Sequence, residues 1–207
     1  MKPTGKRKKQ RPANKVEDPM DPGAKSDRVR FPFNERKAAA AAAFLLDHEG
    51  GTMDYMRLVK LLYLAERESL ARLSHPIAGD VYSALDQGPI LSRVLDLCKY
   101  KSTGPWAAQI ERSGLWAVKL RKPPDLGPLS AAEVAILEEV AKRFHERDQW
   151  DLSTLMRGLP EWNDPRGGRL EILLEEVLVA VGKTTEETRE MLDEAIEGAQ
   201  LAAAFCR

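Results

Sequence analysis

The amino-acid sequence favours an α+β fold: a mainly helical single domain with a small three-stranded antiparallel sheet, preceded by a disordered basic tail. Three observations support this expectation. Apolar residues recur at helical spacing over most of the chain after residue 33, two segments at 77–85 and 106–120 have the pattern of strands, and the first thirty residues are basic and rich in proline. We therefore assign 1–30 to the tail and 31–207 to one domain, because a segment of this size can bury roughly 70% of its unfolded surface in a single core.

The formal net charge of zero conceals two oppositely charged parts. Residues 1–37 contain 12 Lys or Arg against 5 Asp or Glu, so the rest of the chain carries the opposite excess. Large apolar residues are almost absent before Phe31, so the segment cannot bury enough surface to offset the entropy of ordering. Its basic cluster can neutralise phosphates on nucleic acid, although no aromatic residue stands among the charges to stack on a base. The cluster consists of Lys6, Arg7, Lys8, Lys9 and Arg11.

The first two helices are indicated by capping and stop signals. Asn34 can accept hydrogen bonds from the free amides at the start of a helix that runs through an alanine-rich segment to Leu46, and Gly50-Gly51 ends it. A second helix is expected over 53–73. Its leucines occupy more than one face, so this helix should be enclosed on several sides and form the centre of the core.

The stretch at 79–97 changes from strand periodicity to helix periodicity. A strand is expected over 77–85, followed by a turn at 86–89 that is rich in residues with restricted backbone angles. Proline suits the first turn of a helix, so the next helix is expected from about Pro89 to Tyr100.

A hairpin is expected further along the chain. Two short segments, 106–111 and 115–120, flank Arg112-Ser113-Gly114, which has the composition of a turn. A hairpin alone is marginally stable, so we expect the strand at 77–85 to join it and complete the three-stranded sheet.

Each of the remaining helices has its own signal. Two of them begin with a capping box, in which a hydroxyl side chain and a glutamate three residues later bond to each other's backbone amides. The expected elements are a Ser130–Glu133 box for a helix through about Glu146, an Asp151 cap for a short helix ending near Arg157, an apolar stripe over 170–181, and a Thr184–Glu187 box for the last helix.

Catalytic and metal-binding patterns are weak in this sequence. The three histidines include no pair at the spacing that places two ligands on one helical face. Asp47-His48-Glu49 and the run at 145–148 are charged segments at helix ends, where such residues are ordinary, and the sequence has no phosphate-binding loop or nucleophile elbow. We therefore expect no enzyme activity, no metal and no cofactor, and a hydrolase built on His75 and Asp80 is a minor alternative.

Cysteine usage and hydropathy favour a cytoplasmic protein without a membrane partner. The two cysteines, Cys98 and Cys206, cannot build a disulfide framework, and Cys98 lies on an apolar helical stripe, as a buried thiol would. No apolar segment of signal-peptide length follows the basic tail, and no window of the sequence is apolar enough to span a membrane.

An ordered set of short motifs lies between Lys60 and Leu97. It comprises Lys-Leu-Leu-Tyr-Leu-Ala at 60–65, Pro-Ile-Ala-Gly-Asp at 76–80 and Gly-Pro at 88–89. In this order the motifs resemble the signature of the Panacea domain, also called the SocA-like or phage-associated GepA-like family. Weaker resemblance extends over about 33–169. The residues that carry the motif are Lys60, Tyr63, Gly79, Gly88 and Pro89.

The resemblance implies an antitoxin, because members of this family neutralise toxins encoded beside them, generally by direct protein contact and in some cases through regulated proteolysis. The expected partner is a cognate toxin encoded nearby, with a cellular protease system as a further partner. A nucleic-acid-binding regulator that uses the basic tail is the alternative. Family members often carry a Thr-His pair before a Trp in a later loop, whereas this chain has Arg-Gly-Leu-Pro-Glu-Trp at 157–162.

Aromatic and charged residues are the candidates for toxin contact, because interface anchors favour aromatic side chains. An internal role is the alternative for several of them: Tyr63, Trp106 and Trp116 as core residues, and Asp80 as a turn residue that bonds to local amides. The candidate contacts are Asp80, Tyr82, Asp86, Gln87, Trp106 and Trp116.

Overall fold

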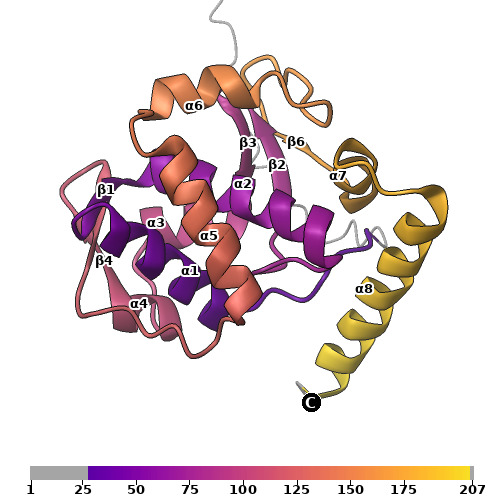
Figure 1. Cartoon of the computed structure of the whole chain (residues 1–207), viewed down its shortest axis with the longest axis horizontal. Helices are drawn as coiled ribbons and strands as arrows, with labels where there is room; N and C mark the ends of the chain where they lie inside the picture. Colours follow the sequence, from indigo (N-terminus) through magenta and orange to yellow (C-terminus); the bar gives the residue numbers. More distant parts are fainter. Residues whose placement is uncertain (1–27, 206–207) are drawn as a thin grey trace, which may run out of the picture.

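A computed structural model describes residues 28–205 of the chain (Figure 1). This part forms the expected α+β domain, in which helices surround two small antiparallel sheets. In chain order the elements are α1 Glu35–His48, β1 Thr52–Asp54, α2 Tyr55–Leu73, β2 Tyr82–Leu85, β3 Gly88–Leu91, α3 Ser92–Lys99, α4 Pro105–Gln109, β4 Ile110–Ser113, β5 Ala117–Leu120, α5 Ala131–Phe144, α6 Gln149–Met156, β6 Leu170–Glu171, α7 Leu174–Ala180 and α8 Thr185–Phe205.

Helix α2 is the centre of the core, as the sequence predicts. It packs against α1, α3, α5, α6 and α7 and against strands of both sheets. Leu62 on this helix is 4% exposed, and its neighbours on every face are buried as well. Helix α1 approaches α2 closely because all six alanines at 38–43 are buried and have no long side chains. Asn34 caps α1 as expected, with its side chain accepting from the backbone amide of Lys37.

The strands form two sheets rather than the single sheet that we expected. The first, which we call the inner sheet, has the order β3-β2-β6 and lies against α2 and α6. The second, the outer sheet, has the order β1-β5-β4 and contains the expected hairpin. The third strand of the outer sheet is β1, in which Met53 pairs with Val118 of β5. Residues 77–85, which we expected in this place, belong to the inner sheet and the loop before it.

The predicted starts of two strands, at residues 106 and 77, are wrong. Residues 105–109 form α4 because Gly104 and Pro105 start a helical turn there, so the hairpin begins only at Ile110. Residues 77–81 form no strand and run as a loop into β2. Alternation of apolar residues therefore predicted neither the backbone geometry nor the burial of this segment, because Asp80 and Tyr82 are buried whereas Val81 and Leu85 are only half-buried.

The expected helix start at Pro89 is also wrong. Residues 88–91 form β3, with Pro89 opposite Ala84 of β2, and α3 starts at Ser92. Because β3 is an edge strand, the amide that proline lacks is not needed for pairing. The stretch at 79–97 is thus a loop, a tight hairpin and a helix in succession.

Two of the three predicted helix caps in the C-terminal third are confirmed. The Ser130–Glu133 box starts α5, and Thr184 and Glu187 bond reciprocally at the start of α8. The cap of α6 is Asp148, three residues before the expected Asp151. The expected helix over 170–181 is divided, because Leu170 and Glu171 pair with β2 before α7 begins.

The predicted tail falls almost wholly on residues 1–27, and the basic cluster Lys6, Arg7, Lys8, Lys9 and Arg11 lies outside the described residues. Residues 28–30 are described and run beside β6, where Arg28 and Arg30 form ion pairs with Glu171. Within residues 28–205, no helix combines the length and the apolar character needed to cross a membrane.

Candidate functional site

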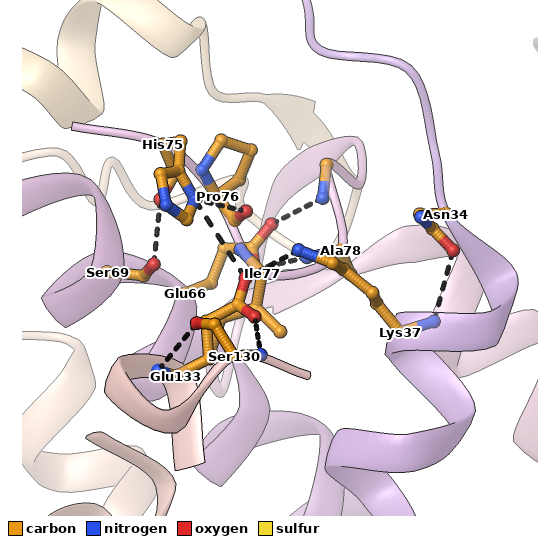
Figure 2. A network of polar contacts seen from close by, with 11 residues as sticks. Asn34, Lys37, Glu66, Ser69, His75, Pro76, Ile77, Ala78, Ser130 and Glu133 are labelled. Atoms are coloured by element: carbon orange, nitrogen blue, oxygen red, sulfur yellow. Dashed lines mark hydrogen bonds and ion pairs between the residues drawn. The ribbon is translucent and has the colours of Figure 1, made fainter. Parts of the chain in front are cut away.

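The motif at 60–89 is built around Glu66, a carboxylate of α2 that is 1% exposed. Its Oε2 atom accepts hydrogen bonds from the amides of Ile77 and Ala78, each at 2.9 Å, and Oε1 accepts from the amide of Gly79 at 2.8 Å. Figure 2 shows Glu66 facing this loop. The loop that follows α2 therefore takes its shape from one buried side chain, which supplies the partners that a strand would otherwise provide.

Glu66 also connects the loop to the inner sheet. Burial raises the pKa of its carboxyl group and the nearby Asp80 carboxylate adds to this, while the bonds from the loop amides act in the opposite direction. The hydroxyl of Tyr82 in β2 donates to Oε1 of Glu66 at 3.4 Å. Tyr82 is 5% exposed, and burial followed by the Glu66 carboxylate raises the pKa of its hydroxyl well above 10. The Tyr82 side chain is thus buried and makes an internal contact with Glu66.

Asp80 is a second buried carboxylate of the motif, 2% exposed. It accepts from the amides of Arg93 and Val94 at 2.9 Å each and from the amide of Val81 at 2.6 Å. Two of these amides belong to the first turn of α3, which has no cap from its own preceding residue. Asp80 therefore caps α3 from the loop that precedes β2. This agrees with the alternative interpretation of Asp80 as a residue that bonds to backbone amides, so we no longer count it among the candidate toxin contacts.

A polar network next to Glu66 ties α1, α5 and the loop together (Figure 2). Lys37 of α1 donates to Glu133 of α5 at 2.7 Å, and His75 of the loop lies 3.9 Å from the same carboxylate. Burial alone would raise the pKa of Glu133, but the bonds from Lys37 and from the Ser130 amide lower it. Within residues 28–205, no hydrogen bond or ion pair joins His75 to Asp80, so the minor hydrolase alternative lacks its pair.

The two glycines of the motif are required by close approaches of other segments. Gly79 has a φ of +69°, and a Cβ atom there would lie 2.5 Å from the carbonyl oxygen of Pro32. The ring of Pro32 in turn lies close to Gly198 of α8. Gly88, with a φ of +103°, turns the inner hairpin, and a Cβ atom there would lie 2.9 Å from the Cβ of Met156. Both positions therefore admit only glycine without rearrangement.

Lys60 and Tyr63 complete the motif on α2, and their environments differ. The Lys60 side chain is fully buried, its Nζ has no hydrogen-bond partner among the described residues, and burial lowers its pKa to about 8. The hydroxyl of Tyr63 donates to Glu161 at 3.0 Å, and Arg67 donates to the same oxygen at 2.8 Å. Glu161 stands in the stretch 157–162, so this departure from the family pattern places a buried carboxylate against α2.

The remaining candidate contacts separate into one buried residue and three surface residues. Trp106 is 2% exposed and is a core residue, so it is removed from the contact surface together with Asp80 and Tyr82. Asp86 and Gln87 occupy the turn of the inner hairpin, where Asp86 accepts from the amide of Gly167 at 2.8 Å. Trp116 is 65% exposed at the end of the outer hairpin.

The model of one family, the antitoxin SocA-like Panacea domain, matches residues 58–163. The chain belongs to the Panacea family. No curated protein and no solved structure matches the chain. The matched region extends from the first half of α2 to the loop after α6, so it contains both hairpins but not α1, α7 or α8.

Around the outer hairpin of this Panacea domain, the predicted Trp116 belongs to an exposed surface whose other members sequence reasoning missed. Leu115 and Tyr100 are 74% and 66% exposed, and Trp116 stacks on Tyr55 with ring centroids 6.1 Å apart. Arg112 connects the end of α3 to the turn of the outer hairpin, since its guanidinium donates hydrogen bonds to the carbonyls of Lys99 and Leu115. We call Tyr100, Leu115 and Trp116 the hairpin surface. The apolar pair after Gly114 was the available signal, but nothing local links it to Tyr100.

A groove of about 280 Å³ adjoins the hairpin surface. Apolar side chains and basic side chains line it together with one acidic residue, Glu111, which pairs with Arg121, so an occupant would meet apolar walls next to an excess of positive charge. The lining includes Leu97, Tyr100, Lys101, Ile110, Glu111, Arg112 and Arg121.

Proposed function

We propose that this chain is the antitoxin of a toxin–antitoxin pair and that it neutralises a cognate protein toxin by direct contact. Membership of the Panacea family supports the antitoxin role. The observation that carries direct contact is the hairpin surface, where three large apolar side chains are each at least 65% exposed beside a groove. Aromatic residues in this setting are the usual anchors of protein interfaces.

The charge around the groove indicates what kind of toxin segment would fit. Arg121 is paired with Glu111, so Lys101 and Arg112 supply the excess positive charge, while Leu97 and Ile110 supply apolar walls. A segment with an aliphatic or aromatic side chain flanked by Asp or Glu would bury its anchor and meet opposite charge at the edge. In this proposal the domain acts by binding and not by catalysis, and Asp80 and Glu66 serve the fold.

The test is co-expression with each neighbouring gene product, scored by growth and by co-purification. We expect one neighbour to be toxic alone, to be neutralised together with this chain and to co-purify with it. Trp116→Ala and Leu115→Ser should weaken both rescue and co-purification. Val179→Ser is the matched control, because Val179 is 63% exposed on α7, far from the outer hairpin (Figure 1).

The outcomes separate the parts of the proposal. Failure of every neighbouring product to bind would overturn neutralisation by contact. Binding that survives both hairpin variants would keep direct contact and reject the hairpin surface as its site. Rescue in which the toxin disappears without forming a stable complex would favour the proteolytic route.

The uneven charge of the chain favours a second candidate, a nucleic-acid-binding regulator that uses the basic tail. Phosphate binding by five clustered basic residues predicts an affinity for duplex DNA that falls steeply with salt. Deletion of residues 1–27 should abolish this binding, and an electrophoretic mobility shift at two salt concentrations would show it. Equal binding by the truncated chain would reject the tail as the site.

A further inference from the structure

Two helix ends meet at the surface and bring together side chains that are far apart in the sequence. His48 is the last residue of α1 and Glu49 caps it, while His145 caps the end of α5. The potential ligand atoms of these three side chains all lie within 4.8 Å of one another. The closest pair is His145 Nδ1 and Glu49 Oε1 at 3.0 Å, and the two imidazole rings lie edge to face with centroids 6.0 Å apart.

Arg57 of α2 forms hydrogen bonds with Glu49 of this cluster and with the end of α5. Its guanidinium donates to Glu49 Oε1 at 3.0 Å and to the carbonyls of Phe144, His145 and Arg147 at 2.8–3.2 Å. Within residues 28–205, the hydrogen bonds to Glu49 all go to Oε1, so Oε2 is available to coordinate an ion.

We propose that His48, Glu49 and His145 form a binding site for a divalent ion of the zinc class. Two imidazoles and one carboxylate are a common set of three protein ligands for Zn²⁺, with water in the fourth position. Zinc ligands lie about 2.0–2.2 Å from the ion, so the three side chains must draw closer by roughly an ångström. His48 and His145 are exposed and have room to rotate, and the negative ends of α1 and α5 favour a cation there.

Arg57 fits this site as an outer partner and not as a competitor for the same atom. Carboxylates that bind metals are themselves usually hydrogen-bonded, and such bonds hold the ligand in its orientation. Arg57 already does this from the Oε1 side, while it also binds the end of α5. Zinc would link α1 directly to α5, two helices that already pack together. This binding does not depend on the proposed antitoxin role.

The test is titration of Zn²⁺ into the full chain, produced without a histidine tag and with Cys206→Ser so that this thiol does not bind the ion. Calorimetry should give one ion per chain, and Zn²⁺ should raise the melting temperature because only the folded state has the site. His48→Ala and His145→Ala should each weaken binding by at least about tenfold, the lower end of what even outer partners contribute. His75→Ala, which removes the other histidine, should leave binding unchanged.

Several outcomes would overturn the site. Absence of saturable Zn²⁺ binding would do so, as would binding that persists in both the His48 and the His145 variants. Melting curves without metal check that the variants fold, and His48→Gln and His145→Gln serve as closer replacements if the alanine variants do not. Co²⁺ provides an independent readout, since its visible absorption should show a coordinated ion in the wild-type chain and not in either variant.

Discussion

The inner and outer sheets have the same number of strands but are held in place in different ways. The inner hairpin is buried on both strands, and the carboxylates of Glu66 and Asp80 fix the loop before it and the helix after it. The outer hairpin is half-exposed, and its ion pairs, between Glu111 and the side chains of Lys119 and Arg121, lie at the surface. The motif at 60–89 therefore builds the interior, while the hairpin surface, where we propose that a toxin binds, lies at the outer sheet.

The largest expected effect comes from removing the carboxylate that organises the inner sheet. Glu66→Ala leaves three buried amides without an acceptor, and each such group costs about 1–3 kcal/mol, so the free energy of unfolding should fall by about 5 kcal/mol. Glu111→Ala in the outer sheet removes only exposed ion pairs and should cost less than about 1 kcal/mol. Urea denaturation of both variants compares them, and equal losses would contradict the distinction between the sheets.

A smaller contrast is expected between the glycines of the two hairpin turns. Gly88→Val introduces a side chain at a positive φ and against Met156, so strain and overpacking should together cost about 4 kcal/mol. Gly114 also has a positive φ, but no atom lies within 4 Å of the position that its Cβ would take. Gly114→Val should therefore cost only the strain, about 1–3 kcal/mol. Thermal melts of the two variants would show the order, and a reversed order would refute the packing argument.

The third contrast concerns charge on α2. Glu66 has several hydrogen-bond partners, whereas the Lys60 ammonium has none within residues 28–205. The charge of Asp54 at the end of β1 raises the pKa of Lys60 only in part against the effect of burial. Burial lowers the Lys60 pKa from 10.5 to about 8, so below pH 8 the folded protein carries a penalty of about 3 kcal/mol at most. The unfolded chain keeps this proton up to a higher pH than the folded chain, so the penalty disappears as the pH rises from about 8 to 10.5.

Lys60→Met removes that penalty and should stabilise the protein most at pH 7. The gain over wild type should shrink toward zero as the pH rises to 10.5 and above, because the wild-type lysine is then neutral in the folded state and loses its proton in the unfolded state as well. The difference between the two proteins is the useful quantity, since burial raises the pKa of Cys98, and this thiol makes stability fall over the same pH range. A gain that stays constant from pH 7 to 10.5 would show that the pKa of Lys60 is the same in the folded and the unfolded chain, and would refute the effect of burial on this group.

Local signals in the sequence were enough to locate most helices. Asn34, the Ser130–Glu133 box and the Thr184–Glu187 box all cap the helices that they predict, because a cap depends only on residues three or four positions apart. The predictions of a strand at 106–109 and of a helix from residue 89 were wrong because short apolar segments fit either geometry. Residues 88–91 form a strand because they pair with β2.

The candidate site was harder to predict because exposure is a property of the whole fold. Asp80, Tyr82 and Trp106 have side chains typical of interfaces, but their partners come from other segments: Asp80 binds amides of α3, and Tyr82 reaches Glu66. The proximity of Glu49 and His145 is equally nonlocal, since 96 positions separate them. Asp86, Gln87 and Trp116 lie at the surface and stay predictions as toxin contacts.

Pro32 connects the two ends of the described chain. Its carbonyl lies against Gly79 of the motif loop and its ring against Gly198 of α8, so the segment at 28–34 is held between the loop and the last helix. A mechanical load on the chain at residue 28 would act first on the ion pairs with Glu171 of β6 and then on the contacts of Pro32 with the motif loop and α8. Pulling at the start of the domain should therefore detach β6 and the last helix before it separates the two hairpins.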